Sequence, residues 1–88
     1  MNKRKLELGN KNIIGARVTE ARLACGLLQK DLLAKLQVEG IDISLTALSL
    51  LEGQKRPVSD YELQALAIVL QKDPNWFLGW EEGKQTTK

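Results

Sequence analysis

Apolar residues recur every three or four positions along most of the chain, a spacing that places them on one face of an α-helix. The pattern predicts a first helix over about residues 12–25. Asn10 or Asn12 can cap its start, and Gly26 can end it in the left-handed conformation. Its inward face consists of Ile14, Val18 and Ala21.

A second helix is predicted to begin near Gln29 and to stop at Gly40. Its inward candidates are Leu32, Leu33 and Leu36. The residues that follow, at 41–43, are too few for a sheet strand of consequence.

A third, shorter helix is predicted at about residues 45–52, because Ser44 is a favourable N-cap residue. Leu48 and Leu51 are three positions apart and define its buried face. Gly53 is predicted to end it.

The clearest helix start is a capping box formed by Ser59 and Glu62. Leu63, Leu66, Ala67 and Leu70 repeat behind it at helical spacing. A fifth helix is predicted to begin at Asp73 and Pro74, where an aspartate cap precedes a first-turn proline, and to continue through Trp76, Phe77 and Leu78.

Five short helices with short links and no strand pattern predict a compact all-α domain. The predicted domain covers residues 12–80. A flexible arm is expected over residues 1–11 and a disordered tail over residues 81–88.

Charge is unevenly distributed along the chain. Residues 1–57 carry ten lysines and arginines against six acidic residues, whereas residues 58–88 carry three against five. A basic first part and an acidic second part favour a polyanion as the partner of one face. Chance is the alternative explanation in a chain of 88 residues.

Cysteine and histidine usage narrows the function classes. Cys25 is the single cysteine, so no internal disulfide can form and a reducing, cytoplasmic setting is expected. Histidine is absent, which removes the usual general base and a common zinc ligand. Without paired carboxylates or a glycine-rich phosphate loop, no enzyme activity, small-molecule substrate, cofactor or metal is expected. No signal peptide or membrane span is expected either.

Five segments, taken in order, resemble the Cro/C1-type helix-turn-helix family, also called the XRE family. They are IGARVTEAR at 14–22, QKDLLAKL at 29–36, SLTALSLLE at 44–52, KRPVSDYELQALAIVL at 55–70 and WFLG at 76–79. The resemblance implies a five-helix, lambda-repressor-like fold. It also implies that the helix over about 45–52 enters the major groove of double-stranded DNA and that the protein is a homodimer.

The resemblance places DNA contacts on both helices of the motif and on the loop after them. Gln29 and Lys30 lie at a helix amino end, which attracts phosphate, although an ordinary solvated helix start is the alternative. Lys55 and Arg56 are expected beside the flanking phosphate backbone. The expected groove contacts are Ser44, Leu45, Thr46 and Ser49.

A structural ion pair is also implied. In the family an arginine of the first helix pairs with the glutamate that ends the recognition helix, and these positions correspond to Arg22 and Glu52. The pair would tie the first helix to the third and hold the recognition helix in place.

The chain departs from the family pattern in its connections. The link between the second and third helices, LQVEGIDIS, is longer than the commonest form. Leu28 stands where serine or threonine usually caps the helix, and packing as a hydrophobic staple is an alternative role for it. Gly53 comes one position earlier than the family's usual glycine.

Leu45 and Leu50 occupy positions that are usually polar or basic in the family. A leucine cannot hydrogen-bond a base edge, but it can meet a thymine methyl group. Either the two leucines contact thymine methyls in an A·T-rich site, or their face binds a protein.

The sequence therefore predicts a DNA-binding transcriptional regulator of bacterial or phage type. The alternative is a protein-interaction module that keeps the fold without binding DNA. Phe77 and Trp80 are candidate dimer contacts, with core packing as the alternative for Phe77 and the favoured role for Trp76.

Overall fold

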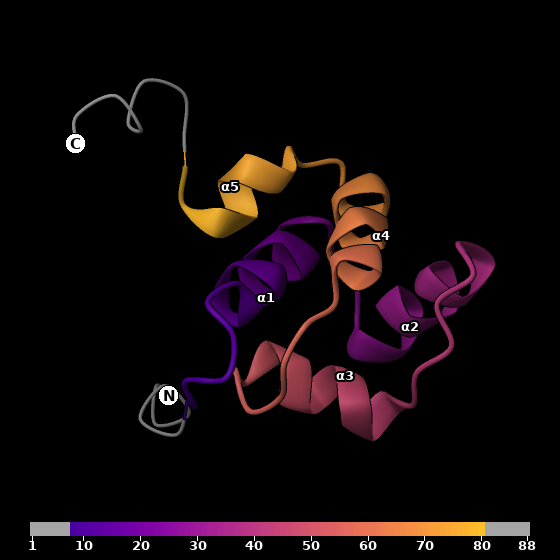
Figure 1. The fold of residues 1–88 in the computed structure, drawn as a ribbon. Coiled ribbons are helices and arrows are strands. Elements are labelled where there is room, and N and C mark those ends of the chain that lie inside the picture. Colours follow the sequence, from indigo (N-terminus) through magenta and orange to yellow (C-terminus); the bar gives the residue numbers. More distant parts are fainter. Residues whose placement is uncertain (1–7, 81–88) are drawn as a thin grey trace.

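The computed structural model describes residues 8–80, so most of the predicted arm and the whole predicted tail lie outside the described residues. The described part contains helices and no strand, which confirms the all-α prediction. The helices in order are α1 Gly15–Ala24, α2 Gln29–Val38, α3 Leu45–Glu52, α4 Asp60–Leu70 and α5 Pro74–Leu78 (Figure 1).

Helix α4 is the centre of the arrangement. It contacts α1, α2 and α5, while α3 packs against α1 and α2. Helices α3 and α5 lie on opposite sides of α1 and α4 (Figure 1). One side of α3 is therefore left uncovered by the other helices.

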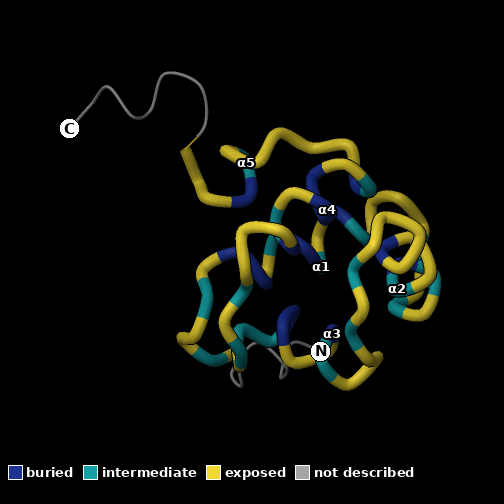
Figure 2. The backbone as a smooth tube through the Cα atoms, turned by 45° about the vertical axis from the view of Figure 1, so that its right-hand side comes forward, coloured by how far each residue is buried: buried dark blue, intermediate teal, exposed yellow. Residues whose placement is uncertain are grey.

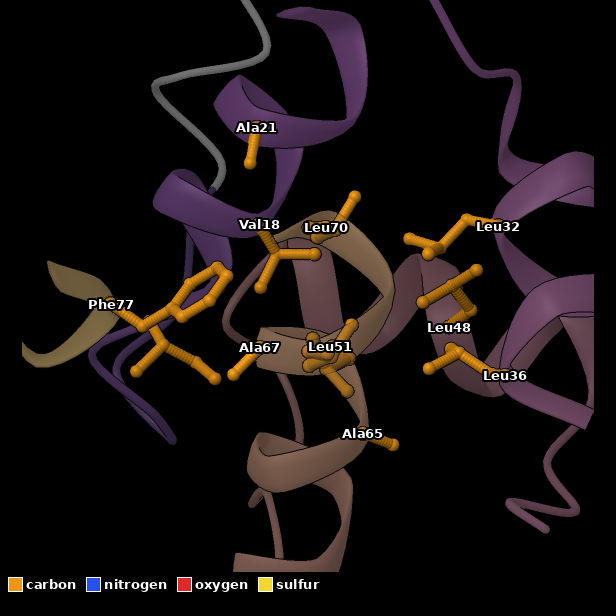
Figure 3. Packing of buried hydrophobic residues seen from close by; sticks show 12 residues of the cluster. Val18, Ala21, Leu32, Leu36, Leu48, Leu51, Ala65, Ala67, Leu70 and Phe77 are labelled. Atoms are coloured by element: carbon orange, nitrogen blue, oxygen red, sulfur yellow. The ribbon is translucent and has the colours of Figure 1, made fainter. Parts of the chain in front are cut away.

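A single hydrophobic core is built from the inward faces of all five helices (Figure 3). Figure 2 shows that buried residues lie on the inner sides of the helices and exposed residues on their outer sides. The predicted inward residues are buried, except for Leu33 and Leu63, which are half-buried. The largest fully buried side chains are Val18, Leu32, Leu36, Leu48, Leu51, Leu66, Leu70 and Phe77.

The aromatic residues within and just after α5 differ in burial. The prediction that Phe77 is a dimer contact is wrong, because its side chain is only 1% exposed and packs in the core. Trp76 meets Phe77 edge to face, and the centroid of its ring lies 4.9 Å from the Arg17 guanidinium carbon and 4.5 Å from Lys72 Nζ. Trp80 is 49% exposed and stays available for a contact between copies.

The carboxyl ends of α1 and α3 use the same hydrogen-bonding pattern with different residues. After α1, Gly26 takes the predicted left-handed conformation at φ +73°, and the Leu27 N–H donates to the Arg22 carbonyl. After α3, Gly53 has φ −84°, and the left-handed residue is Gln54 at φ +61°. The early glycine noted in the sequence therefore leaves a glutamine in a conformation that favours glycine.

The segment before α1 is held against the α3–α4 loop. The Gly9 N–H donates to the Gly53 carbonyl at 2.8 Å, and the Lys11 N–H donates to the Gln54 carbonyl at 2.9 Å. The described end of the predicted arm is thus hydrogen-bonded to the fold.

The side-chain amide of Asn12 holds this segment in place through both its nitrogen and its oxygen. Its Nδ2 donates to the carbonyls of Leu51, at 3.1 Å, and Arg56, at 2.8 Å. Its Oδ1 accepts from the N–H groups of Ile14 and Gly15, the N-cap residue and the first residue of α1. Asn12 therefore supports the helix start from two residues ahead of the N-cap position, which Ile14 occupies. A Cβ atom on Gly15 would collide with the Leu51 carbonyl oxygen, which requires glycine where α1 crosses α3.

Candidate nucleic-acid interface

Helix α3 turns one face into the core and the other to solvent. Leu48, Leu51 and Glu52 are buried. The exposed face consists of Leu45, Thr46, Ser49 and Leu50. At about 100° per residue this face spans about 140° around the helix axis, with the two leucines at its edges and the two hydroxyl residues between them.

The amino end of α3 is capped and open to solvent. The Ser44 hydroxyl accepts from the Ala47 N–H at 3.0 Å, as the N-cap prediction requires. Ser44, Leu45 and Thr46 are all exposed. Asp42, also exposed, brings one negative charge within two residues of this end. The helix end can therefore be approached by a ligand, although the aspartate weakens its attraction for anions.

The carboxyl end of α3 is a junction of three helices at the Glu52 carboxylate. Arg22 donates from Nε to Glu52 Oε2 at 2.8 Å, which brings together the two residues of the expected pair. The Thr19 hydroxyl and the Gln29 side-chain amide each donate to Oε1 at 3.0 Å. Since Gln29 begins α2 and Glu52 ends α3, this junction places the start of one helix beside the end of the other.

At the start of α2, Gln29 makes a contact within the protein, whereas the neighbouring Lys30 is exposed to solvent. The Gln29 amide nitrogen is used in the bond to Glu52, whereas Lys30 is exposed. Leu28 is 59% exposed and so is not packed as a hydrophobic staple. The Asp31 carboxylate accepts from the Leu28 N–H at 2.8 Å. This is one half of a capping box, because the leucine side chain has no oxygen to accept the Asp31 N–H in return.

The two basic residues of the loop after α3 also differ: Arg56 is paired within the protein and Lys55 is exposed. Arg56 is half-buried and donates from both terminal nitrogens to the Glu62 carboxylate, at 3.2 and 3.1 Å. Burial acts to raise the pKa of Glu62, but hydrogen bonds from Arg56 and Ser59 and the Arg56 charge outweigh it and lower the pKa. Lys55 is exposed, so it is the loop's more accessible cation.

Lys11 is a further candidate for a contact with nucleic acid, and the sequence patterns did not indicate it. Its backbone bond to Gln54 brings it beside the α3–α4 loop, and its side chain is exposed. No local signal could have indicated this, because the two residues are 43 positions apart. Three exposed lysines are thus attached to segments that meet near the carboxyl end of α3: Lys11, Lys30 and Lys55.

Acidic residues line a hollow on the amino-terminal side of α3. A shallow hollow of about 350 Å³ lies between residues 39–43 and α4, and its lining includes Glu39, Asp42 and Glu62. Among the described residues, no group of histidine, cysteine or acidic side chains could hold a metal ion. None of the helices in residues 8–80 reaches the length and hydrophobicity that a membrane span requires.

Comparison with models of protein families gives no match, and searches of curated proteins and of solved structures give none either.

Proposed function

We propose that the chain is a sequence-specific DNA-binding transcriptional regulator of bacterial or phage type with a lambda-repressor-like helix-turn-helix fold. In this proposal α2 crosses the phosphate backbone and α3 enters the major groove. The protein acts in the cytoplasm as a homodimer. Its two copies of α3 meet half-sites about one helical turn apart.

The observation that carries the proposal is the uncovered face of α3 beside the amino end of α2. The 3.0 Å bond from Gln29 to Glu52 joins these two elements. Lys30 and Lys55 are exposed on the segments that meet there, where they can neutralise phosphates on either side of the groove.

The dimer proposal is supported by the exposed apolar residues at the end of α5. Leu78 is 37% exposed and Trp80 is 49% exposed. Because α1 and α4 separate α5 from α3 (Figure 1), a contact through these residues leaves α3 uncovered. Sedimentation of the protein with Trp80→Ala should show loss of the dimer, while the wild-type protein sediments as two chains.

Selection of bound sequences from a random DNA pool tests the main proposal. Enrichment of one motif with two-fold symmetry is the expected result. Binding to that motif should weaken steeply with salt, because each phosphate contact releases condensed counterions. Binding that is undetectable, or that does not respond to salt, would overturn the proposal.

Single lysine variants test which charges contact DNA. Lys30→Gln and Lys55→Gln should each weaken binding and reduce the slope of log affinity against log salt by about one. Lys72→Gln is the matched control, because Lys72 lies in the α4–α5 connection and its contact is with the Trp76 ring. Its salt slope should equal that of the wild-type protein.

A protein-interaction module is the second candidate, and the exposed Leu45 and Leu50 favour it. Replacing both leucines with glutamine separates the two functions. If α3 binds DNA, the double variant should select an altered DNA motif. If α3 binds a protein, the double variant should lose that complex, and neither form of the protein should enrich a DNA sequence.

A further inference from the structure

The apolar residues on the exposed face of α3 match one chemical feature of the major groove, and this inference rests on the proposed function. Leu45 is 45% exposed and Leu50 is 40% exposed. They border the face on opposite sides, about 140° apart around the helix axis. Thr46 and Ser49, which carry short hydroxyl side chains, lie between them.

The charges on and around the exposed face of α3 indicate which kind of partner binds it. Residues 44–51 contain no acidic or basic side chain, so nothing on the face itself repels DNA. On the adjoining segments the exposed cations Lys30 and Lys55 outnumber exposed Asp42, which lies within two residues of the helix start, and this balance favours a polyanion over an apolar protein surface. Duplex DNA offers an apolar group in its major groove only where the C5-methyl of thymine projects.

A thymine methyl projects into the groove on the side nearer its own strand. Two leucines at opposite edges of one helix face would therefore meet methyl groups that belong to different strands. The hydroxyls between them can donate to or accept from base edges near the groove centre. We propose that Leu45 and Leu50 each contact the methyl group of a thymine, and that the two thymines lie on opposite strands of each half-site.

Removing single methyl groups from the DNA tests this proposal. In the site obtained by selection, each thymine is replaced in turn by deoxyuridine, which lacks only the 5-methyl group. At the two contacted positions the wild-type protein should bind about fourfold more weakly, the factor that corresponds to about 0.8 kcal/mol for one buried carbon. Other thymines should tolerate the replacement.

Protein variants assign each methyl to its leucine. Leu45→Ala should abolish the difference between thymine and deoxyuridine at one position, and Leu50→Ala should abolish it at a position on the other strand. Leu23→Ala removes a leucine that is 62% exposed on α1 and should leave both differences intact.

The outcomes separate this inference from the proposed function. If the site is enriched and binding depends on salt, but no deoxyuridine weakens it, the thymine contacts are wrong and the DNA-binding function stands. If both leucines couple to methyls of one strand, the opposite-strand arrangement is wrong. If no DNA sequence is enriched, the inference and the proposed function are both overturned.

Discussion

Arg22 and Glu52 face each other across the contact between α1 and α3, with Nε 2.8 Å from Oε2 and the second guanidinium nitrogen 3.1 Å from Oε1. Their side chains are 11% and 5% exposed. Because Thr19 and Gln29 donate to the same carboxylate, this one acidic group holds α1, α2 and α3 together.

Glu52→Ala is expected to lower the free energy of unfolding by about 3 kcal/mol, because it strands the Arg22 charge in a mostly buried position. Urea denaturation followed by circular dichroism measures the change. Glu20→Ala is the control, since Glu20 is exposed on α1, and it should change stability by less than about 0.5 kcal/mol. Equal unfolding midpoints for the two variants would contradict the role given to the pair.

Asn12→Asp is expected to destabilise the fold by about 2 kcal/mol at neutral pH. The substitution keeps an acceptor for the Ile14 and Gly15 N–H groups but removes the two N–H donors. It also sets a negative oxygen against the carbonyls of Leu51 and Arg56. Asn10→Asp makes the same substitution at an exposed residue and is the control. The midpoint of thermal unfolding should be several degrees lower for Asn12→Asp than for Asn10→Asp.

Leu28→Ser is expected to stabilise the protein by about 1 kcal/mol, because serine supplies the acceptor that the start of α2 lacks. Its hydroxyl can accept from the Asp31 N–H, which in the native chain donates to the Leu28 carbonyl at 3.0 Å. Leu23→Ser makes the same change at an exposed position within α1 and should not stabilise. A denaturation midpoint for Leu28→Ser at or below that of the wild type would contradict the claim that the lack of a capping side chain at position 28 costs stability.

Gln71→Gly and Gln64→Gly are expected to change stability in opposite directions. Gln71 ends α4 in the left-handed conformation at φ +57°, where glycine should be favoured by about 1 kcal/mol. Gln64 is exposed inside α4, where glycine should cost about 1 kcal/mol. Differential scanning calorimetry should place the two melting temperatures on either side of the wild-type value.

Acid sensitivity is expected to depend on Glu62. Because its pKa is lowered in the folded protein, Glu62 stabilises the fold above the ordinary pKa of 4.5. That contribution is lost as the pH falls through the lowered pKa. Glu62→Gln should therefore be less stable than the wild type at pH 7, and the difference should shrink towards pH 3. Glu39→Gln removes the charge of an exposed glutamate as a control, and at pH 7 it should change stability by less than about 0.5 kcal/mol.

Local patterns were sufficient to predict the helices and their buried faces. The Ser44 and Ser59 caps and the glycine stop after α1 act between residues that are close in the chain, so the sequence displays them directly. The prediction for Phe77 failed, because adjacent aromatic residues on a five-residue helix do not reveal which of them the core receives.

The sequence by itself determined the all-α class, the starts of α2 to α5 and most inward positions of α1 to α4, because capping and helical periodicity depend on residues a few positions apart. Helix α1 begins at Gly15, three residues later than predicted. Only the tertiary structure decided how Asn12 fastens the α3–α4 loop, how Gln29 is drawn to Glu52, and that Arg56 turns inward to Glu62. The first two contacts join residues 44 and 23 positions apart, and the third depends on how the loop folds back onto α4. Which polar groups meet across such separations depends on how the helices pack, and no local spacing encodes it.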